Sequence, residues 1–130
     1  WVDAPPTASE LAAHLFWAAD ILLVPLIPTP LSIRAYETIS LWLQKKKGSL
    51  RSVRPFFNLV DMRKSLHRRL VSEYRMDHPE FLETLIPQAA AVEKMGEECQ
   101  PLLMFAPSHP AAHQYQALFR ELAVAQQVDL

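Results

Sequence analysis

An aspartate near the start of the chain is the first residue whose surroundings suggest chemistry. Asp3 follows the apolar pair Trp1-Val2, a pattern typical of the end of a strand, and two prolines, Pro5 and Pro6, come shortly after it. Proline rings fix φ, so the paired prolines restrict this loop to few shapes. A carboxylate at the carboxyl end of a strand can hold a Mg²⁺-bound water beside a phosphate. The spacing alone favours a turn or helix-capping aspartate, whereas the two prolines favour the phosphate-handling interpretation.

The glycine content restricts the ways in which this chain can bind a phosphate. The 130 residues include eleven prolines but only two glycines, Gly48 and Gly96. A Walker A loop needs two nearby glycines followed by Lys and Ser or Thr, and a dinucleotide-binding loop needs three glycines. Gly48 precedes a serine and Gly96 precedes a glutamate, so neither loop can form from this chain.

The single cysteine and the lengths of the apolar runs indicate the cellular compartment in which the protein is expected. Cys99 has no second cysteine for an internal disulfide, which favours a reducing compartment such as the cytoplasm. Its neighbours Glu97 and Glu98 disfavour the thiolate, so we expect an unreactive thiol. No apolar run approaches the roughly 20 residues that a membrane-spanning helix needs. We therefore expect no insertion into a membrane.

Positive charge is concentrated in the middle of a chain whose overall net charge is −1. Between residues 45 and 75, ten Lys or Arg residues stand against two acidic ones, which gives this window a net charge of +8. A basic face attracts nonspecific DNA through counterion release. The residues predicted to contact DNA are Arg51, Arg54, Arg63, Lys64, Arg68 and Arg69. A solvated helix face is the more common role of any single basic cluster.

Alternating patterns predict the elements that position these residues. Apolar runs indicate strands at 21–27, 53–60 and 83–86, and helical patterns cover 7–19, 32–47, 63–75, 89–95 and the stretch from Ser108 onward, with an extended piece at 101–105. The run at 21–27 is typical of a strand buried on both faces. Such alternation predicts an α/β domain with a mainly parallel sheet and flanking helices. Ligands of these sheets bind beyond the carboxyl ends of the strands.

Local signals also predict where the helices begin, end and face the core. Ser32 and Ser108 are expected to cap two helices, and Gly96 is expected to end the helix at 89–95. In the basic helix, Leu66, Leu70 and Tyr74 recur at four-residue spacing and predict its buried face.

The order of several segments resembles the second half of a ParA/MinD-type ATPase. The segments are Asp3-Ala4-Pro5-Pro6, the run from Ala19 to Ser32 with its Val24-Pro25 pair, Phe57-Asn58-Leu59-Val60-Asp61-Met62-Arg63, Ile86-Pro87 and Ala106-Pro107-Ser108. In that family an Asp-X-Pro-Pro motif ends the Walker B-like strand and begins the second switch. The resemblance covers nearly all of residues 1–130. It implies the C-terminal part of a P-loop NTPase-like domain that lacks the Walker A half.

The resemblance implies roles for individual residues. Asp3 would act through Mg²⁺ and its waters on the γ-phosphate of ATP, and Pro5 and Pro6 would shape the loop that senses hydrolysis. Asn58 would hydrogen-bond the edge of the adenine, and Pro87 would flank the base. Some family members carry Thr in place of this Asn. A buried Asn that only satisfies backbone groups is an equal alternative.

The resemblance also implies partners. Partition proteins of this family bind DNA nonspecifically as ATP-bound dimers, so we expect a homodimer, a ParB-like or cargo-adaptor protein, and DNA at the basic window. MinD-type members use a C-terminal amphipathic membrane helix, but residues 124–130 contain no Lys or Arg, so no membrane partner is expected. Without the Walker A half, the chain alone is expected neither to bind ATP and Mg²⁺ tightly nor to hydrolyse ATP. An apolar sheet edge would also lie exposed.

Two other functions stay open on the sequence. One is a stand-alone protein-interaction module without nucleotide binding. The other is a DNA-binding domain proper, whose affinity for arbitrary duplex would fall steeply with salt.

Overall fold

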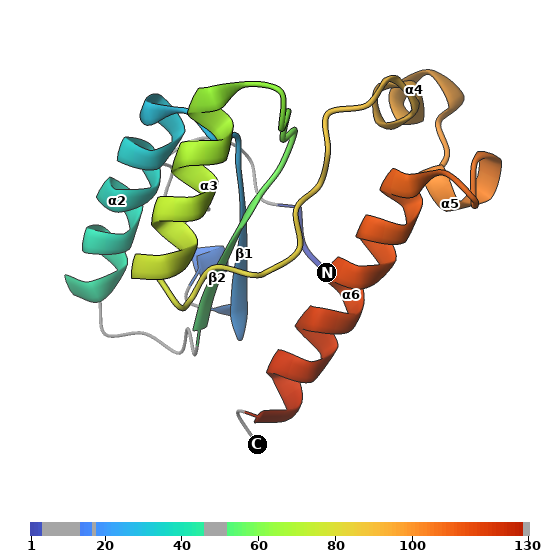
Figure 1. Ribbon diagram of the computed structural model, residues 1–130. Helices are drawn as coiled ribbons and strands as arrows, with labels where there is room; N and C mark the ends of the chain where they lie inside the picture. Colours follow the sequence, from blue (N-terminus) through green and yellow to red (C-terminus); the bar gives the residue numbers. More distant parts are fainter. Residues whose placement is uncertain (4–13, 17, 46–51, 129–130) are drawn as a thin grey trace.

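The computed structural model describes residues 1–3, 14–16, 18–45 and 52–128 of the chain (Figure 1). In chain order the named elements are β1 (Ile21–Leu26), α2 (Pro30–Lys45), β2 (Ser52–Phe57), α3 (Ser65–Asp77), α4 (Ala90–Glu98), α5 (Leu102–Phe105) and α6 (Pro110–Val128). Most of the predicted helix at 7–19 lies outside the described residues, and residues 14–16 and 18 are helical. The chain is thus a mixed α/β structure with flanking helices.

The sheet is built from two parallel strands. β1 and β2 pair in register from Ile21 opposite Ser52 to Leu26 opposite Phe57. This confirms the parallel pairing that the sequence predicts. The expectation that β1 is buried on both faces is wrong, because only Leu26 is fully buried and Pro25 is exposed. Within the described ranges β1 pairs with β2 alone, so its other edge lacks a neighbouring strand.

An extended segment, residues 82–88, runs along the free side of β2. The Leu82 N–H donates to the Pro55 carbonyl at 2.8 Å, and the Ile86 N–H donates to the Phe57 carbonyl at 3.0 Å. Bonds that advance along both segments in the same direction are those of a parallel pair. The segment therefore continues the parallel arrangement beyond β2.

The predicted strand at 83–86 is nevertheless wrong as a regular strand, because only an isolated bridge joins Val60 to Pro87. Pro55 contributes to the interruption, because it faces this segment and has no N–H to donate. The strand predicted at 53–60 also ends early, at Phe57. Leu59 has a φ of 53°, which turns the backbone out of the extended conformation.

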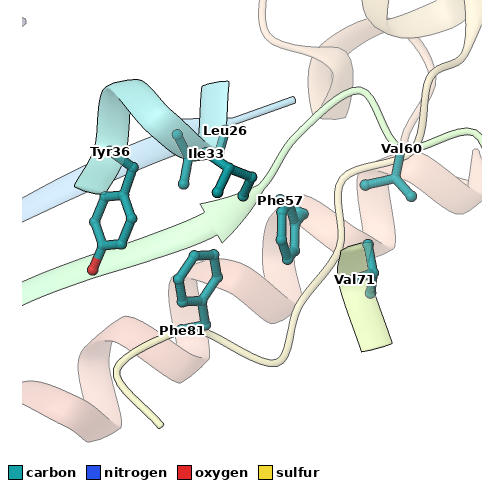
Figure 2. Packing of buried hydrophobic residues seen from close by; sticks show 7 residues of the cluster. All are labelled: Leu26, Ile33, Tyr36, Phe57, Val60, Val71 and Phe81. Atoms are coloured by element: carbon teal, nitrogen blue, oxygen red, sulfur yellow. The ribbon is translucent and has the colours of Figure 1, made fainter. Parts of the chain in front are cut away.

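Helices cover both faces of the sheet. Figure 1 shows α2 and α3 on one side and α6 on the other. The cluster toward α2 and α3 consists of Leu26, Ile33, Tyr36, Phe57, Val60, Val71 and Phe81 (Figure 2). Successive strand residues point to opposite faces, so Phe56 packs instead against Leu118 and Leu122 of α6.

The predicted buried face of helix α3 is confirmed in part. Leu70 is buried and the half-buried Tyr74 packs against the core cluster, but Leu66 is 36% exposed. His67 and Val71 are buried instead of Leu66. The spacing of apolar residues alone defines the predicted face, so it does not include a buried histidine.

Two predicted helix caps are wrong by one to three positions. Thr29, not Ser32, caps α2: its Oγ1 accepts the Ser32 N–H at 3.3 Å, and Pro30 occupies the first helical position, where no N–H is needed. His109, not Ser108, caps α6 just before Pro110, and its Nδ1 accepts the Ala111 N–H at 3.1 Å.

The segment around α4 and α5 differs most from its prediction. α4 continues through Gly96 and ends at Glu98, where Cys99 takes a left-handed φ of 49°. The piece at 101–105, predicted as extended, is the short helix α5. A helical turn buries Leu102, which is 2% exposed, in a cluster with Val92, Ala111 and Ala112. This packing outweighs the ambiguous local pattern.

Candidate functional site at the carboxyl end of β2

Asn58 stands directly after β2, where the sequence places a ligand-binding residue. Its N–H donates to the Leu26 carbonyl at 2.8 Å, so the backbone is still paired with β1. The carboxamide Oδ1 is buried and has no hydrogen-bond partner among the described residues. An unpaired buried acceptor costs about 1–3 kcal/mol. The site thus offers one acceptor for which the described part of the chain supplies no donor.

The backbone beside Asn58 is strained. Leu59 takes the left-handed conformation, with a φ of 53°, which costs a residue with a Cβ about 1–2 kcal/mol. Strain of this kind persists only where the surroundings hold it, and it is frequent at ligand sites. The carboxyl end of β2 therefore combines an unsatisfied polar atom with a strained backbone.

Helix α3 fastens the loop at 58–64. His67 is 5% exposed, and its Nδ1 accepts the Asp61 N–H at 3.0 Å. The Arg68 Nη1 donates to the Met62 carbonyl at 2.8 Å and to the Arg63 carbonyl at 3.1 Å. Two consecutive residues of one helix thus bind backbone groups of three consecutive loop residues, 61 to 63.

A charged pair inside the loop adds a third attachment. The Asp61 carboxylate accepts the Arg63 backbone N–H at 3.0 Å, its Nε at 2.9 Å and its Nη2 at 3.0 Å. The side-chain and backbone hydrogen bonds from Arg63 lower the pKa of Asp61 to about 2. The same hydrogen bond to Asp61 raises the pKa of Arg63. This pairing keeps Asp61 ionised throughout the neutral range.

The six predicted DNA-binding residues differ in exposure and in their partners. Arg51 lies outside the described residues, and Arg54 is a half-buried residue of β2. Arg63 is paired with Asp61, and Arg68 is hydrogen-bonded to loop carbonyls, as described above. Arg63, Lys64, Arg68 and Arg69 are all exposed, and the Arg69 Nε lies 3.8 Å from a Glu73 carboxylate oxygen.

The residues predicted to handle phosphate lie at the start of the chain. Asp3 is exposed and belongs to no regular element, and Pro5 and Pro6 lie outside the described residues. Trp1 is 91% and Val2 is 74% exposed, so the expected strand end has no regular structure. The described ranges contain no group of three or more His, Cys, Asp or Glu side chains that could hold a metal ion.

Pro87 lines an open groove of about 390 Å³ beside the loop. The lining residues are Val60, Met62, Glu83, Leu85, Pro87, Pro110 and Gln114. Asn58 is not among them, although the bridge between Val60 and Pro87 brings the two segments together. The structure thus places Asn58 and Pro87 on adjoining segments without putting both in one pocket.

Glu121 of α6 fixes the wall of this groove. Its carboxylate accepts the backbone N–H groups of Glu83 and Thr84, the latter at 3.0 Å, and the Thr84 hydroxyl at 2.7 Å. No local sequence signal assigns these roles to Glu121 and His67, because Glu121 binds a segment far along the chain and His67 binds a loop outside its own helix.

Comparisons with known proteins add no relative. The chain matches no protein-family model and no curated protein. Within the described ranges, no helix combines the length and apolar character needed to cross a membrane.

Proposed function

We propose that this chain is the C-terminal part of a ParA-type ATPase, which positions or partitions DNA or a protein cargo, and that Asn58 binds the adenine of its nucleotide. The observation that carries the proposal is the buried, unpaired Oδ1 of Asn58 at the carboxyl end of a parallel strand. Ligands of α/β sheets bind beyond this end. The parallel succession of β1, β2 and residues 82–88 supports the same proposal.

Adenine fits the polar atom that Asn58 offers. Its exocyclic N6 amine is a donor, and Oδ1 is an acceptor without a donor in the described ranges. Pro87 supplies an apolar surface on the adjoining segment. In this proposal Asn58 and Pro87 hold the base, and Asp3 binds Mg²⁺ through water. ATP supplies the phosphoanhydride bond whose hydrolysis drives the switch in this family.

Further parts of the proposal concern assembly and activity. Homodimer formation, a ParB-like or cargo-adaptor partner, nonspecific DNA and a cytoplasmic location belong to it. Because the 130 residues contain no Walker A loop to hold the phosphates, we expect the chain alone neither to bind ATP tightly nor to hydrolyse it. Mg²⁺-dependent turnover of ATP by the purified chain would contradict the expectation that hydrolysis needs a Walker A loop that these residues do not contain.

NMR can locate adenosine on the chain. Asn58 is the only asparagine in the sequence, so its side-chain amide can be assigned by substitution. Titration with adenosine is expected to shift this amide together with the backbone signals of residues 58–60, and Asn58→Ala is expected to abolish those shifts. Gln114→Ala, in the groove, is the matched control and should leave them intact. Shifts confined to the groove, or none at millimolar adenosine, would refute the role of Asn58.

A further inference from the structure

The backbone of β1 turns successive residues to opposite edges of the sheet. The Ser52 N–H donates to the Asp20 carbonyl at 3.2 Å, and the Asn58 N–H donates to the Leu26 carbonyl at 2.8 Å. The even-numbered residues from 20 to 26 therefore turn their backbone N–H and carbonyl groups toward β2. Because these groups alternate between the two edges of a strand, the odd-numbered residues turn theirs to the outer edge, where no strand lies among the described residues.

A short stretch of this outer edge can bond to another strand. Ile21 and Leu23 each present an N–H and a carbonyl there, whereas Pro25 has no N–H. Just before the strand, the Ala19 N–H already donates to the Leu15 carbonyl at 3.0 Å. β1 contains no charged residue of the kind by which many edge strands resist pairing. The stretch from residue 21 to residue 23 is therefore the part of the edge at which a partner strand can bond.

An exposed phenylalanine of α6 lies on the flank toward this edge. Leu118 and Leu122 of α6 pack against the sheet. Glu121 binds residues 83–84, which lie on the far side of β2 from β1. Successive helix residues are about 100° apart, so Phe119 lies on the opposite flank from Glu121, which is the side of β1. The Phe119 side chain is 61% exposed.

Helix α2 presents an apolar residue to the same edge from the other face of the sheet. Ile33 and Tyr36 of α2 belong to the core cluster. Glu37 accepts the Tyr74 hydroxyl of α3 at 2.7 Å, so it marks the flank that faces α3. Ile39 lies on the opposite flank, toward the outer edge of β1, and is 38% exposed. A strand that pairs with this edge must therefore be uncharged and apolar on both faces.

We propose that two copies of this chain pair in antiparallel fashion through the outer edges of their β1 strands, around a two-fold axis at Leu22. In this register Ile21 of each copy exchanges two backbone hydrogen bonds with Leu23 of the other copy. The pairing ends where Pro25 of one copy lies opposite Ala19 of the other, because neither offers an N–H. This dimer contact does not rest on the proposed nucleotide site.

A second copy fits this edge because β1 itself meets the requirements that the flanking helices set. Its six residues are uncharged and apolar, and residues 21–24 are only half-buried within one chain. A two-fold axis perpendicular to the sheet keeps each helix on its own face. Phe119 then approaches its copy on one face, and Ile39 approaches its copy on the other. The same axis makes the contact self-complementary and closes the assembly at two copies.

Sedimentation velocity of the 130-residue chain at increasing concentration tests dimer formation, and amide hydrogen exchange at each concentration locates the contact. We expect a monomer–dimer equilibrium in which exchange at Ile21 and Leu23 slows as the dimer fraction rises. Exchange at Leu22 and Val24 should not follow the dimer fraction, because their N–H groups point toward β2. A chain that stays monomeric, or a dimer without slower exchange at Ile21 and Leu23, would overturn the proposal.

Two substitutions that involve proline test the register. Ile21→Pro removes an outward N–H at the first residue of the strand, where no bond to β2 is lost. It should weaken the dimer about tenfold, because each dimer loses two hydrogen bonds. Pro25→Ala is the matched control: it adds an N–H beyond the paired residues and should not weaken the dimer. Equal weakening by both substitutions would contradict this register. If Ile21→Pro fails to fold, the exchange measured in the original chain decides the question by itself.

The dimer contact and the adenine site fail separately. A dimer in which Ile21 and Leu23 are protected, but in which adenosine does not shift the Asn58 amide, would support the pairing and refute the adenine site. A chain that stays monomeric and binds adenosine through Asn58 would support the adenine site and refute the pairing.

Discussion

Glu121 holds α6 against the extended segment at 82–88, and its removal is expected to destabilise the fold measurably. The carboxylate accepts three hydrogen bonds, from two backbone N–H groups and the Thr84 hydroxyl. Hydrogen bonds to a charged group contribute about 1.5–3 kcal/mol each when buried. Glu83 is exposed and Glu121 is half-buried, so water recovers part of this energy. We expect Glu121→Ala to lower the free energy of unfolding by about 2 kcal/mol in total.

Thermal and urea unfolding followed by circular dichroism test this value. For a chain of this length, a loss of about 2 kcal/mol corresponds to a fall in Tm of about 5–8 °C. Gln116→Ala, an exposed change on the same helix, should alter stability by less than about 0.5 kcal/mol. In a double-mutant cycle, Glu121→Ala and Thr84→Ala should couple by about 1 kcal/mol. A Glu121→Ala protein as stable as the Gln116→Ala control, or a coupling near zero, would refute the claim that Glu121 holds α6 against residues 82–88.

Three further predictions concern the loop, the charges and the core. Arg63 lowers the pKa of Asp61 from 3.8 to about 2, so the ionised Asp61 stabilises the fold fully above about pH 4, and this stabilisation is lost as the pH falls toward 2. The Tm difference between the original chain and Asp61→Asn should therefore shrink over that range. A constant difference would contradict the pairing. The double variant Lys64→Gln/Arg69→Gln should lower by about 2 the slope of the logarithm of DNA affinity against the logarithm of salt concentration. Arg68→Gln should lower Tm with little effect on this slope, because Arg68 binds loop carbonyls. A reversed pattern would mean that Arg68 faces the DNA. Phe57→Ala, at a fully buried position, should cost about 3–5 kcal/mol in urea unfolding, against less than about 0.5 kcal/mol for the exposed Phe119→Ala; similar losses would contradict the packing in Figure 2.

The elements from β1 to α3 could be predicted because their signals are local. An apolar run such as 21–27 or a helical spacing such as that in 32–47 identifies an element from a few neighbouring residues. The strand at 83–86 failed for a reason that spans the chain, since Pro55 of another strand removes a donor from the shared ladder. Residues 101–105 formed a helix because distant α4 and α6 residues pack around Leu102.

The candidate site could be predicted only in part. The position of Asn58 follows from the end of an apolar run, but its unpaired Oδ1 depends on every group that packs around it. Counting charges predicts a basic face, which stays a prediction, but it does not predict that Arg68 binds loop carbonyls five and six residues away. The buried position of His67 could not be predicted, because a polar residue on a buried helix face is recognised only when its partner is known.

The most direct test of Asn58 as the adenine-binding residue is the affinity of the chain for adenosine relative to guanosine. An acceptor that has no partner among the described residues before binding should discriminate between the two bases by about 1.4 kcal/mol, or about tenfold, in favour of adenosine. We expect this preference in the original chain and its disappearance in Asn58→Ala, with both dissociation constants measured by the NMR titration. Equal affinities for the two nucleosides, or a preference that persists in Asn58→Ala, would contradict the assignment of Asn58 as the adenine-binding residue.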